Sequence, residues 1–143
     1  MPEFKLQSVL NYRKLLEDVS CQEFAERLTE EQRLAAAVKE ERAKLDELHR
    51  TVEERRLEGI AAQELWLLEE GIRHQGRVLK KAEERLAQAH VKTEEKRAAL
   101  QEASRKRRLM DKLKEHHDEN EAARLQQRER NEIDEIAVLF HKR

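Results

Sequence analysis

The scarcity of helix-breaking residues is the feature that most restricts how this chain can fold. Its 143 residues contain a single proline and three glycines, namely Pro2, Gly59, Gly71 and Gly76. Proline interrupts a helix and glycine weakens one, so a chain with so few of them and 43% charged residues is typical of long helices. We therefore expect an all-α protein that is helical over nearly its whole length.

The apolar pattern loses its phase once, around Gly59. This break predicts one helix over about residues 5–57, a turn at about 58–61 and a second helix over about 62–141. Hydrophobic residues make up 38% of the chain and aromatic residues 3%, which is too little for a layered globular core. Burial should be confined to a seam where the two helices meet.

The seam can be read from apolar residues that recur at alternating steps of three and four, the heptad pattern of a coiled coil. In the first helix the pattern runs through Leu34, Val38, Glu41, Leu45, Leu48 and Val52. In the second helix it runs through Leu65, Leu68, Ile72, Gln75, Leu79, Ala82, Leu86, Ala89, Thr93, Lys96, Leu100, Ala103 and Met110. The predicted fold is a single domain over residues 1–143, a long antiparallel two-helix coiled-coil hairpin with an overhanging second helix.

The charged residues outside the seam are spaced to support the helices. Acidic residues precede basic ones by four positions in the pairs Glu23 with Arg27, Glu40 with Lys44, Glu69 with Arg73 and Glu102 with Lys106. Each such pair stabilises a helix by only about 0.2–0.5 kcal/mol. Association of the helices must therefore come from the seam.

The position of the turn predicts an overhang. A fold back at Gly59 places Phe4 near Lys114 and leaves roughly 29 residues, about 40 Å of helix, without an intramolecular partner. The overhang ends in residues that are apolar on nearly every side, namely Ile133, Ile136, Ala137, Val138, Leu139 and Phe140. We interpret this end of an expected rod as a binding surface.

The turn end also carries surplus apolar residues. Leu65, Trp66, Leu67 and Leu68 are consecutive, so they point through most of a helical turn, and Trp66 or Leu67 must face away from the first helix. Two interpretations stay open. Trp66 packs over the Gly59 turn, or it forms a docking knob at the tip of the hairpin.

Composition and spacing argue against several functional classes. The formal net charge is −1, which gives no field that favours nucleic acid. The longest apolar runs are far below the roughly 20 residues needed to span a bilayer. The single Cys21 precludes an internal disulfide, so a reducing, cytosolic address is expected. No signal peptide is expected either.

No arrangement of residues points to catalysis or to a cofactor. His116 and His117 diverge on a helix, and His74 and His90 lack a ligand three or four positions away, so we expect these side chains to be solvated. The chain has no glycine-rich phosphate loop and no nucleophile with a partnered base. We predict no enzymatic activity, no metal and no cofactor.

One local excess of positive charge remains, Ser104 to Arg108 followed by Lys112 and Lys114. Acidic residues follow at once and no aromatic side chain is interleaved, which favours a solvated or protein-facing patch over a nucleic-acid or membrane surface.

The two ends of the sequence resemble a known family. The opening Phe4-Lys5-Leu6-Gln7-Ser8-Val9-Leu10-Asn11-Tyr12-Arg13 is similar to the F-x-L-x-x-V-L-x-x-R start of the flagellar FliJ proteins. The closing Glu132-Ile133-Asp134-Glu135-Ile136-Ala137, with Phe140, resembles the end of that family, and the break at Gly59 and the longer second helix agree with it. Gly71 departs from the family, in which a large, often aromatic, residue stands at that place.

The resemblance implies a non-catalytic part of the flagellar type III export apparatus that is similar to the central stalk of rotary ATPases. Its partners would be the hexameric export ATPase, the cytoplasmic domain of the export-gate membrane protein, and export chaperones. It would lie in the cytoplasm at the inner face of the cell membrane, held there through partners only. The residues assigned to the ATPase end are Phe4, Leu6, Val9, Leu10, Arg13, Ile133, Glu135 and Phe140. Those assigned to the gate end are Leu57, Trp66, Leu67, Leu68 and Ile72.

Three alternatives remain at this point. The overhang could pair with a second copy of the chain, which would make the protein a dimerising tether. The chain could be the equivalent stalk of a virulence injectisome. It could also escort export substrates through its basic patch, which would make binding sensitive to salt.

Overall fold

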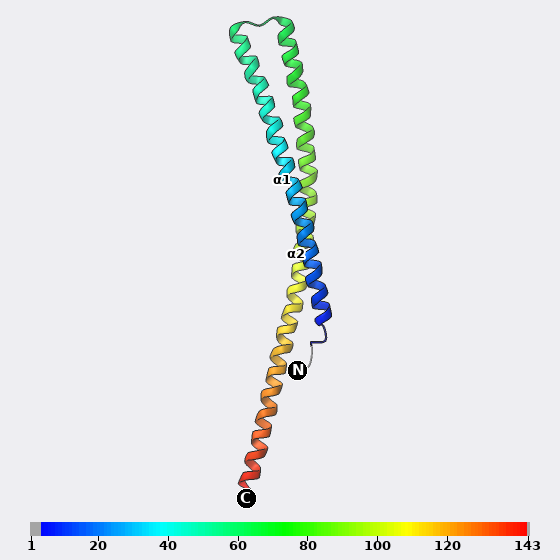
Figure 1. Ribbon diagram of the computed structural model, residues 1–143, viewed down its shortest axis with the longest axis vertical. Coiled ribbons are helices and arrows are strands. Elements are labelled where there is room, and N and C mark those ends of the chain that lie inside the picture. The colour runs from blue at the N-terminus through cyan, green and yellow to red at the C-terminus, as the bar shows by residue number, and fades with distance from the viewer. Residues whose placement is uncertain (1–3, 143) are drawn as a thin grey trace. The chain divides into compact units, whose positions relative to one another are not determined.

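The computed structural model describes residues 4–142, which form two α-helices and contain no strand (Figure 1). Helix α1 spans Gln7–Glu58 and has 52 residues. Helix α2 spans Ala62–His141 and has 80 residues. The two helices pack against each other, which confirms the all-α hairpin expected from the scarcity of proline and glycine.

A short loop of three residues, Gly59 to Ala61, joins the helices. Gly59 has a φ of 91°, a left-handed conformation that glycine adopts without the steric cost of a Cβ. Its N–H donates to the carbonyl of Arg56 at 3.4 Å, and the N–H of Leu65 donates to the carbonyl of Ala61 at 3.0 Å. Gly59 thus ends α1 as a C-terminal capping residue.

The described chain divides into two compact units. One comprises Cys21–Ala99 and contains the loop, so it is called the loop unit here. The other, called the terminal unit, comprises the residues up to Ser20 and those from Leu100 onward.

The core of the loop unit is the predicted seam. Val38, Val52, Ala89 and Thr93 are buried, and every other heptad position of this unit named from the sequence is half-buried. Polar side chains cross the seam as well, because Gln75 bonds to Glu41 and Lys96 pairs with Glu23. The seam is therefore apolar along most of its length and interrupted by polar layers.

In the terminal unit the first turns of α1 pack against α2. Leu10 is fully buried, Arg107 pairs with Glu17 at 3.1 Å, and the Phe4 ring lies 5.3 Å from the ring of His117. The expectation that Phe4 lies near Lys114 was therefore wrong by three residues. The loop unit shows the same offset, because Glu31 meets His90. The loop is centred on Ile60 rather than Gly59, so each residue of α1 faces a residue of α2 that lies further from the loop than predicted.

Burial ends before α2 does. Glu121 is half-buried, whereas every residue from Ala122 to Lys142 is exposed. These residues form the C-terminal segment (residues 122–142), which is helical as far as His141 and is not packed against any described residue of α1 (Figure 1). The overhang thus begins at Ala122, seven residues after the predicted Glu115.

Ion pairs within each helix follow the predicted spacing of four at Glu102 with Lys106, which lie 4.0 Å apart, but at few other places. Most of them join residues three apart, such as Glu70 with Arg73 and Glu102 with Arg105. Glu69 instead reaches Arg56 of α1 at 3.6 Å, and Glu23 reaches Lys96. The prediction considered each helix alone. Acidic residues beside the seam can instead pair with basic residues of the opposite helix, as Glu69 and Glu23 do.

The loop geometry predicts opposite effects for substitutions at different glycines. Gly59→Ala should lower the free energy of unfolding by about 1 kcal/mol, since a Cβ disfavours the left-handed conformation. Gly71→Ala and Gly76→Ala are matched controls, because an added Cβ at either position meets nothing within 4 Å. Both should raise it by roughly 0.5–1 kcal/mol. Urea unfolding followed by circular dichroism measures the free energy of unfolding of all three variants. Equal changes at the three sites would contradict the left-handed conformation of Gly59 in the loop.

Candidate partner-binding surfaces

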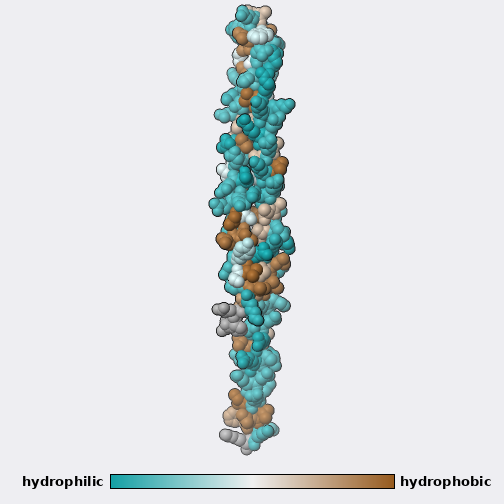
Figure 2. Space-filling model, turned by 90° about the vertical axis from the view of Figure 1, so that its right-hand side faces the viewer, coloured by the Kyte–Doolittle hydropathy of each residue, from teal (hydrophilic) through white to brown (hydrophobic). Residues whose placement is uncertain are grey.

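The end of α2 carries the largest unpartnered apolar side chains of the terminal unit. Ile133, Ile136 and Phe140 are spaced three and four apart, so they share one face of the helix, and Phe140 is 72% exposed. Leu139 flanks this stripe and Val138 lies on the opposite side. Figure 2 shows apolar atoms gathered over these last turns. Glu135, also assigned to this surface, is exposed.

The residues assigned to the ATPase end fall into two groups, one near the start of the chain and one near its end, and the two groups lie apart along α2. Leu6 and Val9 are exposed, Phe4 and Arg13 are half-buried, and Leu10 is fully buried in the seam. Leu10 therefore packs between the helices and is not available to a partner, which corrects its assignment as a contact residue. Ile133 lies sixteen residues beyond His117, the residue that Phe4 contacts, which is about 24 Å along α2.

The loop end presents three of the five residues assigned to the gate. Leu57 is 90% exposed, and Trp66 and Leu67 are each more than half exposed. Leu68 and Ile72 are half-buried at seam positions. The exposure of Trp66 favours the docking interpretation over the one in which it closes the turn.

Sequence reasoning missed a second apolar surface in the terminal unit. Tyr12, Leu15 and Val19 of α1 are exposed, as are Leu109 and Leu113 of α2. Leu109 and Leu113 line a shallow groove together with Lys112 and His116. The spacing of Leu109 and Leu113, one turn apart and off the heptad positions, is the pattern that could have indicated this surface.

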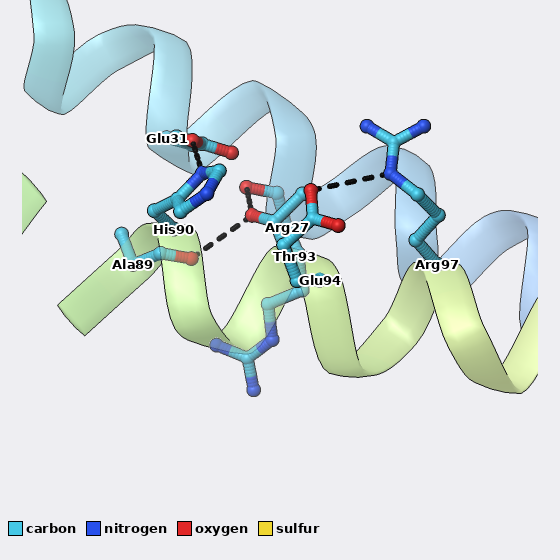
Figure 3. Close-up of polar contacts among 7 residues, drawn as sticks. All are labelled: Arg27, Glu31, Ala89, His90, Thr93, Glu94 and Arg97. Atoms are coloured by element: carbon cyan, nitrogen blue, oxygen red, sulfur yellow. Dashed lines mark hydrogen bonds and ion pairs between the residues drawn. The ribbon is translucent and has the colours of Figure 1, made fainter. Parts of the chain in front are cut away.

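A group of polar side chains crosses the seam in the loop unit (Figure 3). The Nδ1 atom of His90 lies 2.6 Å from a carboxylate oxygen of Glu31. The Thr93 hydroxyl lies within hydrogen-bond distance of the carbonyls of Ala89, at 2.9 Å, and Arg27, at 3.2 Å. The Glu31–His90 and Thr93–Arg27 contacts join the two helices, so they fix which turns of α1 and α2 face each other.

One of the four histidines, His117, does not have the solvated environment that we expected, and His90 is exposed but paired. His90 is paired with Glu31, and His117 is half-buried against Phe4. Sequence reasoning missed these contacts because it treated each helix alone, whereas His90 meets a residue of α1 and His117 meets Phe4, which precedes α1.

Hydrogen bonds in the seam lower the pKa of two carboxyl groups. The pKa of Glu31 lies below its ordinary value, chiefly because of the hydrogen bond with His90. The pKa of Glu41 is lowered mainly by the amide of Gln75, which also donates to the Glu41 carbonyl at 3.0 Å. A bonded carboxylate at a heptad position favours one register of the helices over its alternatives.

The basic stretch from Ser104 to Arg108 is largely neutralised within the chain. Arg107 pairs with Glu17 and Asp111, and Arg105 pairs with Glu102 at 2.5 Å. Arg107 is half-buried, so its charge serves the contact between the helices. This pairing weakens the interpretation of the stretch as a surface for acidic substrates.

Two further properties concern the described part of the chain. Among residues 4–142 no three or more His, Cys, Asp and Glu side chains are placed to hold a metal ion. Within the same range, neither helix is long and apolar enough to cross a membrane.

The hairpin, its longer second helix and the motifs at both ends agree with one family. The sequence model of the flagellar FliJ protein matches residues 2–143. The chain belongs to the FliJ family. It is therefore a coiled-coil component of the flagellar export apparatus, and this favours the flagellar system over an injectisome. No curated protein and no solved structure matches the chain.

The Glu31 contact predicts a pH dependence. Its depressed pKa means that the carboxylate contributes stability above the ordinary value of 4.5, and that this contribution is lost as the pH falls through the lower folded-state pKa. Glu31→Gln should thus lower the free energy of unfolding near neutral pH and have little effect near pH 3. Urea unfolding at several pH values measures this difference.

The control is Glu40→Gln, because Glu40 is exposed and makes no ion pair among the described residues. Its effect should be small and independent of pH. A Glu31→Gln effect that stays constant from neutral pH to pH 3 would contradict the contact.

Proposed function

We propose that this chain is a non-catalytic stalk that binds the hexameric export ATPase through the C-terminal segment and stimulates ATP hydrolysis. The loop end, through Leu57, Trp66 and Leu67, contacts the cytoplasmic domain of the export-gate protein. The protein works in the cytoplasm at the inner face of the membrane, where its partners hold it, and it returns empty export chaperones for reuse.

The exposed apolar stripe of the C-terminal segment is the observation that carries this proposal. Exposure of Ile133, Ile136 and Phe140 to water costs free energy, and no residue of the described terminal unit covers them. A helix of this length without tertiary contacts is marginally stable in water, so a partner that buries the stripe also stabilises the helix. The family match supports the export ATPase as that partner.

The shape of the segment also favours a pore over a flat surface. Apolar residues lie on more than one side of the last turns, because Val138 projects opposite the stripe formed by Ile136 and Phe140. A ring surrounds a helix and can contact all of its sides, whereas a flat surface contacts only one. The loop end is different, because Leu68 and Ile72 are held in the seam there.

The test is ATP hydrolysis by the cognate export ATPase, titrated with the full chain and with a chain truncated before Ile133. The full chain should stimulate hydrolysis and the truncated chain should not. Phe140→Ala should raise the concentration needed for half-maximal stimulation about 30-fold, since removing a central aromatic contact costs on the order of 2 kcal/mol.

Val91→Ala is the matched control, because Val91 is a 56% exposed apolar residue of the loop unit that belongs to neither proposed surface. It should leave stimulation unchanged. Equal stimulation by the full and truncated chains would contradict the assignment of the C-terminal segment. Trp66→Ala should weaken binding to the gate domain and spare stimulation, and the reverse pattern would exchange the two ends.

The same stripe supports one alternative, pairing with a second copy of the chain. Leu125 extends the exposed apolar surface towards the middle of the terminal unit, as a helix-to-helix interface would require. Light scattering distinguishes the two proposals. A dimer that persists on dilution, together with an absence of ATPase stimulation, would favour the tether.

A further inference from the structure

A basic groove lies along one flank of the loop unit, between α1 and α2. Its charged lining consists of four cations and one carboxylate, contributed by Arg27, Glu30, Arg33, Arg85 and Lys92. The floor is apolar and consists of the half-buried Leu34 and Ala37 and the buried Ala89. Because alanines occupy the seam here, the helices leave a hollow of about 480 Å³ that larger side chains would fill.

The charges of this groove are mostly unpaired. Arg33 binds Glu30, but Arg27, Arg85 and Lys92 have no carboxylate oxygen within 4.0 Å among residues 4–142. In the view of Figure 3 the Arg27 guanidinium points away from the carboxylates of Glu31 and Glu94. Lys81 and Arg77 continue the same face of α2 towards the loop, also without an ion pair.

The opposite flank of the same turns differs from the basic groove, because its charges are paired within the chain. A groove there is lined by three ion pairs, formed by Glu31 with His90, Arg42 with Glu83, and Glu94 with Arg97. That flank is neutralised within the chain, whereas the basic groove retains about three uncompensated positive charges. Electrostatic complementarity therefore calls for an anionic occupant on one flank only.

We propose that the basic groove is the docking site of an acidic amphipathic helix from a partner protein. Two antiparallel helices with an alanine floor leave a furrow into which a third helix can pack, with small apolar residues on the floor. Glutamates on either side of that helix would meet Arg27 and Arg33 on one wall and Arg85 and Lys92 on the other. The inference is independent of the two end surfaces proposed above.

The helix is favoured over an anionic membrane because the cations line two walls of a concave furrow. A flat headgroup surface would contact the rims and leave the floor of Ala37 and Ala89 open. A third helix fills the floor and reaches both walls at once.

The probe is a capped peptide of three Glu-Ala-Ala-Leu-Glu-Ala-Gln repeats, titrated into the full chain while backbone amide resonances are recorded by NMR. The shifts should be confined to residues 27–37 and 85–92. The double variant Arg85→Gln with Lys92→Gln should bind at least about fivefold more weakly, because each exposed ion pair contributes a modest free energy. Circular dichroism confirms that the variant is folded.

The control is the double variant Lys39→Gln with Lys80→Gln, which removes the same charge from exposed residues of the loop unit that do not line the groove. It should change the affinity less than about twofold. Equal weakening by the two variants, or equal binding of a peptide with Gln in place of Glu, would overturn the proposal. Binding of phosphatidylserine vesicles through Arg85 and Lys92, with none of the peptide, would overturn it in favour of a lipid surface.

Discussion

Packing between α1 and α2 is the interaction on which the rest of this structure depends. A chain with 3% aromatic residues and 43% charged residues has no other interior, so each turn is held only where it faces the other helix. Leu10, Val38, Val52 and Ala89 are buried because they lie at that contact. Burial of α2 ends a few residues beyond His117, which faces the start of the described chain at Phe4, and the rest of α2 depends on a partner for its stability.

Polar groups within the seam decide how the helices are aligned. An apolar heptad seam alone specifies the register weakly, because the same pattern of apolar positions recurs every seven residues. Glu41 with Gln75, and Thr93 with the carbonyl of Arg27, are satisfied in one register only. The same seam leaves two unlike flanks, one closed by ion pairs and one with unpaired cations, and so the two sides of the loop unit differ in what they can bind.

Most of the fold could be predicted from the sequence, because the scarcity of breakers and the heptad spacing are properties of each helix alone. The positions from Leu34 to Met110 that the spacing assigned to the seam are all buried or half-buried. What could not be predicted depends on both helices at once. The register shift that brings Phe4 to His117, the Glu31 to His90 pair, and the burial of Leu10 arise from contacts between turns far apart in sequence. The candidate surfaces were predictable where apolar residues exceed what a seam can cover, as at Phe140 and Trp66.

The central claim is that the C-terminal segment lacks a tertiary partner among residues 4–142 and gains one in the export ATPase. Hydrogen exchange measured by mass spectrometry tests it most directly, on the chain alone and mixed with the ATPase ring. Peptides from residues 122–142 should exchange rapidly in the free chain, while those around Val38 and Ala89 exchange slowly, and the ATPase should slow exchange in the C-terminal segment. Strong protection of residues 122–142 in the free monomer, or no change on adding the ATPase, would contradict the account.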